Sequence, residues 1–269
     1  MEQAVTETAA HRMSLLGKPI NLYGLNLWGI TMGRYEEWAR YKNVWLARQS
    51  TFPVFCISVS FLEALFLLDM DAIEKAGKPA GFLYNIMYCL GMALRLNENC
   101  VHDGDIFISA DENDRKLNAI VVKQSGGNKY VEITPSMFTE IRETVAWMQG
   151  DKLPDESLND ELIETEKELS ERNSPVLKYD LLDMEASVAL AYEMRIGEVL
   201  NWTILEFETA RRAIDRDKKY LICGIGATNG CNWDGGNPYP SWCFDREITE
   251  SSALIAQSQF GKTKINKKE

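Results

Sequence analysis

The sequence predicts a mainly α-helical protein with one small antiparallel sheet, which is an α+β fold. Apolar residues recur every three or four positions over much of the chain, and helix-capping signals precede several of these stretches. Three short β-rich runs lie close together between polar turns. With 269 residues, of which 45% are hydrophobic and 26% charged, the chain has the composition of a folded protein with a real core.

The chain is expected to begin with a flexible arm over residues 1–19, which lack an apolar period and end in a Gly-Lys-Pro break. Residues 20–28 are then expected to be extended, and Thr31 is the expected N-cap of the next helix. This helix carries four aromatic residues at helical spacing: Tyr35, Trp38, Tyr41 and Trp45. Such a stripe usually packs into a core. The alternatives are a groove for a partner protein or a stacking platform for bases, and the acidic composition argues against the latter.

Two more helices are predicted in the first half of the chain. Ser60 and Glu63 have the spacing of a capping box and open an apolar helix that runs through Leu68. After a break at residues 77–79, residues 81–96 form a helix that is apolar on almost every side. That pattern predicts a position in the middle of the domain.

A three-stranded antiparallel meander is predicted next, with strands at 105–110, 117–123 and 129–133. Thr134 and Pro135 have the residue types of an N-cap and a first helical position. In the helix that they open, apolar residues recur at intervals of three and four and can cover one face of the sheet: Phe138, Ile141, Val145 and Met148. Residues 20–150 thus form the first predicted domain.

An acidic connection is expected to separate this domain from a second one. Residues 151–177 are highly charged and are predicted to form a solvated linker helix. A helical domain follows at 178–230, in which Thr203 and Glu206 have the spacing of a second capping box. Residues 231–269 are rich in Gly, Pro and Trp and end in basic residues, so an irregular arm and tail are expected.

Charge and hydropathy exclude several classes of partner. The formal charge of -11 repels a phosphate backbone, so nucleic acid is not an expected partner. The acidic N-terminus does not resemble a signal peptide, and no apolar run is long enough to cross a bilayer, so we expect a cytoplasmic protein without a membrane partner. The six cysteines include no Cys-x-x-Cys pair and are expected to be reduced thiols: Cys56, Cys89, Cys100, Cys223, Cys231 and Cys243.

No stretch of the sequence gathers the groups of a recognised reactive site. Gly224, Gly226 and Gly230 follow an apolar run as in a dinucleotide-binding loop, but the residues after them cannot form the helix that would hold a pyrophosphate. The cysteines and the two histidines, His11 and His102, lack the spacing of a zinc site. The acidic residues between 103 and 114 lack the order of a calcium-binding loop. We predict no catalytic, cofactor-binding or metal-binding residue, and no cofactor.

Three segments carry a family resemblance: GLNLWGITMGRYEEW, EITPSMFTEIRETVAWMQG and EVLNWTILEFETARRAIDRDKKYLI. Together they resemble the tail assembly chaperones and tail morphogenesis proteins of tailed bacteriophages and prophages of Gram-positive bacteria. The resemblance implies an assembly factor that holds the tape-measure or tube protein without covalent chemistry. It implies partner-binding surfaces at the aromatic stripe and in the extended C-terminal arm, at Pro238, Tyr239 and Trp242.

The leading hypothesis is therefore a non-enzymatic tail assembly protein that binds other tail proteins through apolar and aromatic faces. The alternative is a structural component of the mature particle, such as a connector or baseplate subunit. A third hypothesis is an enzyme or metal protein whose site forms only in three dimensions. Self-association into a homo-oligomer is compatible with each of them.

Overall fold

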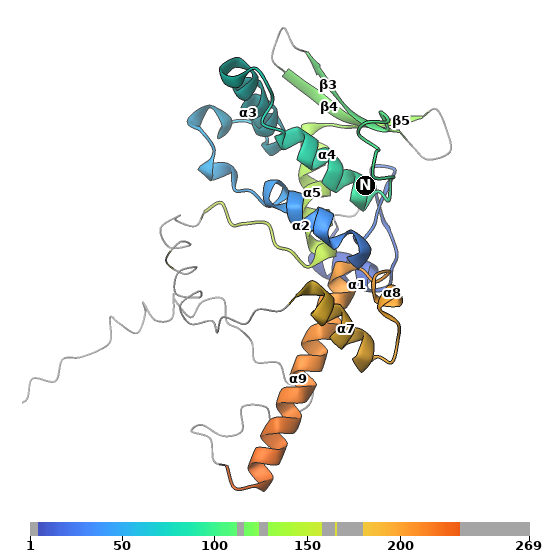
Figure 1. The fold of residues 1–269 in the computed structure, drawn as a ribbon. Helices are drawn as coiled ribbons and strands as arrows, with labels where there is room; N and C mark the ends of the chain where they lie inside the picture. Colours follow the sequence, from blue (N-terminus) through green and yellow to red (C-terminus); the bar gives the residue numbers. More distant parts are fainter. Residues whose placement is uncertain (1–4, 112–115, 124–128, 158–164, 166–179, 232–269) are drawn as a thin grey trace, which may run out of the picture. The chain divides into compact units, whose positions relative to one another are not determined.

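A computed structural model describes residues 5–111, 116–123, 129–157, 165 and 180–231 (Figure 1). It is mainly helical and contains a two-stranded and a three-stranded antiparallel sheet, so the predicted α+β class is confirmed. The chain divides into two compact units, the first made of residues 1–156 and 181–210 and the second of 157–180 and 211–269. Most of the predicted linker helix at 151–177, and all but residue 231 of the predicted arm and tail, lie outside the described residues.

The N-terminal segment contains a helix, so the prediction of a flexible arm over residues 1–19 is wrong for its described part. Helix α1 spans Glu7–Leu15, and the side chain of Thr6 caps it by accepting a hydrogen bond from the amide of Ala9. Its buried residues are Ala10 and Ser14, and α1 packs against helix α5 (Pro135–Gln149). A helix that buries only small residues leaves no apolar period in the sequence, which explains the error.

A β-hairpin occupies the segment that was expected to be extended. Strands β1 (Ile20–Leu22) and β2 (Leu25–Leu27) pair antiparallel around Tyr23 and Gly24, whose φ angles are 54° and 77°. Two consecutive positive φ values are the signature of a tight type I′ turn. A short 3₁₀ turn follows at Met32–Arg34 and leads directly into helix α2 (Tyr35–Trp45).

Thr31 does not cap α2, contrary to the prediction. It precedes the 3₁₀ turn and makes no side-chain cap bond, whereas Arg34 stands at the N-cap of α2. The inserted turn moves the start of the α-helix by one turn, and nothing in the residue types announces it.

Helices α3 (Phe61–Ala76) and α4 (Phe82–Ala93) form a helical hairpin. The predicted capping box at the start of α3 is confirmed. The buried carboxylate of Asp69, on α3, accepts hydrogen bonds from the amides of Gly81, Phe82 and Leu83 at 2.7, 3.1 and 2.9 Å. It satisfies donors that the first turn of α4 leaves free, and thereby ties the start of α4 to α3.

The predicted meander and the helix after it are both present. Strands β3 (Ile106–Asp111), β4 (Lys116–Lys123) and β5 (Tyr130–Ile133) pair antiparallel in that order, and α4 and α5 contact them (Figure 1). Helix α5 begins with Thr134 as its side-chain cap and ends at Gly150 with a φ of 77°. All four residues of its predicted apolar stripe are fully buried: Phe138, Ile141, Val145 and Met148.

In the part of the chain described after the acidic segment there are three helices. Helix α7 spans Leu181–Ala191, the single-turn helix α8 spans Ile196–Val199, and α9 spans Ile204–Thr228. The capping box before α9 is confirmed, because the Thr203 amide donates to a carboxylate oxygen of Glu206 at 2.6 Å and the Glu206 amide to the Thr203 hydroxyl at 3.1 Å.

An arginine lies inside the core of the first unit. The Arg142 side chain donates from Nε to the carbonyl oxygen of Trp45 and from Nη2 to that of Ala47, both at 2.7 Å, and its guanidinium lies 3.4 Å from the centre of the Phe61 ring. Burial lowers the pKa of Arg142 to about 10, so the group is still charged at neutral pH. A buried cation is tolerated where carbonyl oxygens and an aromatic face replace its water.

We expect Arg142→Ala to lower the free energy of unfolding by about 3 kcal/mol, because two backbone carbonyls lose their donor inside the core. Urea denaturation followed by circular dichroism measures this. Arg40→Ala, which removes an exposed arginine from α2, is the matched control and should cost less than 1 kcal/mol. Equal effects of the two substitutions would show that the buried contacts contribute nothing.

Gly29 stands where three segments meet, because a Cβ atom at this position would lie 2.5 Å from Ser14 Oγ and 2.7 Å from Thr203 Cγ2. We expect Gly29→Ala to lower the free energy of unfolding by about 2 kcal/mol through this overlap. Gly197→Ala is the control, because nothing lies within 4 Å of a Cβ atom there. The midpoint of thermal unfolding measures the effect. If both variants lower it by the same small amount, the prediction is wrong.

Candidate functional site

The predicted aromatic stripe lies mostly inside the molecule. Trp38 and Trp45 are 0% exposed, and their rings pack edge to face at 6.2 Å. Their indole N–H groups donate to Asp151 Oδ2 at 3.3 Å and to the carbonyl of Arg142 at 3.1 Å. Both rings are thus core residues, and the interpretation of them as partner-binding residues is corrected: a fully buried indole offers no surface to a partner.

The other predicted partner-binding residues divide into two groups. Tyr35 and Tyr41 are half-buried, and Tyr41 stacks on Tyr88 of α4 with 5.3 Å between ring centres. Pro238, Tyr239 and Trp242 lie outside the described residues.

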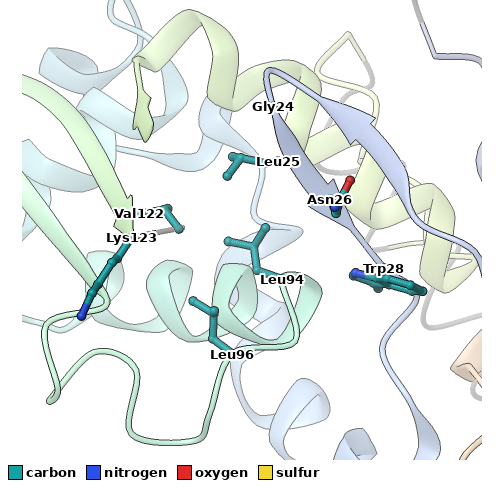
Figure 2. Close-up of a pocket in the computed structure, with 8 residues that line it drawn as sticks. All are labelled: Gly24, Leu25, Asn26, Trp28, Leu94, Leu96, Val122 and Lys123. Carbon is teal, nitrogen blue, oxygen red and sulfur yellow. The ribbon is translucent and has the colours of Figure 1, made fainter. Parts of the chain in front are cut away.

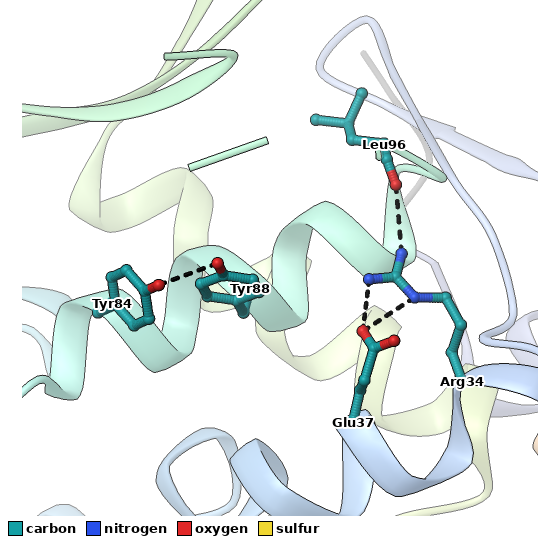
Figure 3. Close-up of polar contacts among 5 residues, drawn as sticks. All are labelled: Arg34, Glu37, Tyr84, Tyr88 and Leu96. Atoms are coloured by element: carbon teal, nitrogen blue, oxygen red, sulfur yellow. Dashed lines mark hydrogen bonds and ion pairs between the residues drawn. The ribbon is translucent and has the colours of Figure 1, made fainter. Parts of the chain in front are cut away.

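A chain of polar aromatic groups runs along α4 to the loop after it. Tyr84 Oη lies 2.9 Å from Tyr88 Oη (Figure 3). It also lies 3.0 Å from Nε2 of His102. The hydrogen bond with Tyr84, followed by burial, raises the pKa of Tyr88, and burial raises the pKa of the Cys89 and Cys100 thiols. These groups therefore stay protonated at neutral pH, which is the opposite of what a nucleophile or a general base requires.

The motifs with a resemblance to ligand sites do not have the geometry of such sites. Gly224 and Gly226 lie inside helix α9, whereas a dinucleotide loop places its glycines at a strand-to-helix turn. Among the residues that the structure describes, no three His, Cys, Asp or Glu side chains are grouped closely enough to hold a metal ion. In the same residues, no helix is both long and apolar enough to span a membrane.

The loop between α2 and α3 exposes a cluster of large apolar side chains. Val54 is 84% exposed, Phe55 48% and Ile57 52%. No charged residue occurs between Arg48 and Glu63. We call Val54, Phe55 and Ile57 the apolar loop. Large contiguous exposed apolar patches are uncommon on monomeric proteins and typically mark contact surfaces.

The backbone of the apolar loop is held in place by side-chain contacts. Gln49 Nε2 donates to the carbonyl oxygens of Cys56 and Val59 at 2.8 and 2.6 Å, and the Cys56 side chain is buried beneath the loop. At the base of the loop, the carboxylate of Glu156 accepts from the amides of Gln49 and Ser50, both at 2.9 Å. A braced loop loses little conformational entropy when a partner covers its side chains.

A shallow groove lies between the β1–β2 hairpin, the end of α4 and the end of β4. It consists of two depressions of about 260 and 290 Å³ that share Leu96. Figure 2 shows Leu25, Leu94, Leu96 and Val122 around the hollow of the first depression, with Lys123 at its rim. The second depression is lined by seven residues: Gly29, Ile30, Thr31, Arg34, Met92, Arg95 and Leu96. We call the two depressions together the hairpin groove.

The cations of the hairpin groove differ in how far they are paired. Arg34 donates to Glu37 Oε2 at 2.6 and 3.1 Å and to the Leu96 carbonyl at 3.2 Å (Figure 3). Lys123 Nζ lies 3.5 Å from Asp105 Oδ1. The Arg95 guanidinium instead lies over the Trp28 ring, with Cζ 3.9 Å from the ring centre, and within the described residues it has no carboxylate partner.

Neither the apolar loop nor the hairpin groove was found from the sequence. The lack of charged residues between Arg48 and Glu63 could have indicated an exposed apolar loop, but an uncharged stretch is equally typical of a buried segment. The groove collects residues from three separate stretches of the chain, and no local pattern links them.

Comparison of the chain with protein-family models, with curated proteins and with solved structures gave no match.

The contact at the base of the apolar loop predicts a pH dependence. Burial by itself would raise the pKa of Glu156, but the amides of Ser50 and Gln49 and the charge of Arg48 outweigh it, so the pKa lies below its ordinary value of 4.5. The ionised carboxylate therefore stabilises the loop above pH 4.5, and this contribution is lost as the pH falls through the lowered pKa. The amide shifts of Gln49 and Ser50 should titrate with a midpoint below 4.5 in NMR spectra. Glu156→Gln should abolish that titration, and a midpoint above 4.5 would contradict the assignment.

Proposed function

We propose that this chain is a non-enzymatic tail assembly protein of a bacteriophage or prophage, and that it binds another tail protein through the apolar loop. The observation that carries the proposal is the exposure of Val54, Phe55 and Ile57 on a braced and uncharged segment. The resemblance of three sequence segments to tail assembly chaperones supplies the class of partner, which is the tape-measure or tube protein.

The energetics favour a reversible contact. Full burial of one exposed large apolar side chain contributes about 1.5–3 kcal/mol. Because Phe55 and Ile57 are already about half covered, the three side chains of the apolar loop together supply a gross contribution of about 4 kcal/mol. Association costs consume much of that, which leaves a weak or intermediate affinity unless other contacts add to it. A factor that must release its partner as the tail polymerises needs an affinity in this range.

The chemistry of the described residues also favours binding over catalysis. The phenol of Tyr88 and the thiols of Cys89 and Cys100 all have raised pKa values, so none of them is activated. An assembly factor of this kind would act in the cytoplasm of the host cell, before the particle is complete.

The proposal is tested by co-expressing the chain with the tail genes encoded beside it and isolating the complex. Replacement of Val54, Phe55 and Ile57 together by Ser should weaken binding at least tenfold, because the apolar contact is lost while the bracing contacts of the backbone remain. Leu16→Ser is the matched control, because Leu16 is 55% exposed and lies outside the loop. If no tail protein binds, or if the triple variant binds as well as the unmodified chain, the proposal is wrong.

Purified virions distinguish the assembly role from that of a structural component. An assembly factor is absent from the mature particle, whereas a connector or baseplate subunit is retained in fixed stoichiometry. Mass spectrometry of purified particles therefore decides between the two.

A further inference from the structure

We propose that the hairpin groove binds an extended acidic segment of a partner polypeptide, with Arg95 holding a carboxylate and the leucines beside it holding a neighbouring apolar side chain. The inference rests on the proposed function in one respect: it takes the occupant to be a polypeptide. The groove itself belongs entirely to the first unit and does not include the apolar loop.

Arg95 occupies an unusual backbone position. Helix α4 ends with the Arg95 amide bonded to the Met92 carbonyl at 3.1 Å and the Leu96 amide bonded to the Gly91 carbonyl at 2.9 Å. This is a Schellman motif, and Arg95 occupies its left-handed position with a φ of 55°. Glycine is the usual residue there, and a residue with a Cβ atom costs about 1 kcal/mol. A strained arginine at an exposed helix end points to a use for its side chain.

The Arg95 guanidinium is held in place and still has unused donors. Stacking on Trp28 orients the group, and Trp28 is itself fixed because its amide donates to the Ala93 carbonyl at 2.8 Å. None of the described carboxylates pairs with Arg95, although the chain carries a net charge of -11. An oriented guanidinium with unused donors matches the two oxygens of a carboxylate.

The lining of the hairpin groove combines cations with apolar side chains. Its described lining contains three cations, Arg34, Arg95 and Lys123, and no Asp or Glu. The depression that Arg95 lines has Ile30, Met92 and Leu96 as apolar members. The adjoining depression has apolar walls of Leu25, Leu94, Leu96 and Val122, which are directed into its hollow (Figure 2). A carboxylate next to a large apolar side chain complements both features. The negative net charge disfavours a nucleic acid, whose phosphates repeat along the whole ligand.

The test uses a displayed library of random twelve-residue peptides, selected on the full-length protein. We expect the selected peptides to be enriched in Asp or Glu next to a large apolar residue. A selected peptide made synthetically should lose at least tenfold in affinity when its acidic residue is changed to the amide, and its binding should weaken as salt is raised.

Arg95→Gly separates binding from folding. The substitution should lower the affinity for the selected peptide at least tenfold. The midpoint of thermal unfolding should stay the same or rise, because glycine suits the left-handed position. Arg40→Gln, which removes an exposed arginine outside the groove, should bind as the unmodified chain does. Arg95→Glu should reverse the selection towards Lys and Arg.

Other outcomes overturn the inference. It is wrong if no acidic peptide is enriched, if Arg95→Gly binds the peptide with full affinity, or if an oligothymidylate binds through Arg95 in place of any peptide. The test does not use tail proteins, so its outcome is separate from that of the proposed function. If a tail complex survives Arg95→Gly but is lost when the apolar loop is substituted, the proposed function stands and the proposed role of the hairpin groove is wrong.

Discussion

The reciprocal contact between Trp45 and Arg142 is the constraint on which the first unit depends. The Trp45 indole N–H donates to the Arg142 carbonyl, and the Arg142 guanidinium donates back to the Trp45 carbonyl. The end of α2 is thereby joined to the middle of α5, and the Trp45 ring packs on Phe138 at 5.4 Å. Because a buried indole and a buried guanidinium both need polar partners, this arrangement satisfies each group with the other's backbone and leaves little freedom in how the two helices meet.

The same constraint decides which apolar groups remain for a partner. The tryptophans of α2 are used inside the core, so the large side chains left exposed nearby are those of the loop that follows α2. The guanidinium of Arg142 also donates to Ala47, and Gln49 two residues later braces the loop from inside. The core contacts of Trp45 and Arg142 therefore also position the backbone at the start of the segment that carries Val54, Phe55 and Ile57.

The apolar loop and the hairpin groove offer different chemistry to a polypeptide. The loop offers apolar area without charge, which gives affinity with little discrimination. The groove offers an oriented cation beside apolar walls, which selects for a particular side-chain pattern and is sensitive to salt. The left-handed backbone of Arg95 costs stability, and the exposed side chain of Val54 adds none.

The sequence by itself determined the local elements of this protein, because their signals are local. The capping boxes at Ser60 and Thr203, the three strands of the meander, and the apolar stripe of α5 all depend on residues within a few positions of one another. Helix α1 escaped prediction because its buried face is made of small residues, which produce burial without an apolar period. Only the tertiary structure decided that Trp38 and Trp45 are core residues, since an amphipathic stripe has the same spacing whether it faces a core or a partner. It also brought Trp28, Arg95 and Lys123 to one groove, because contacts between distant segments depend on packing and leave no periodic trace in the chain.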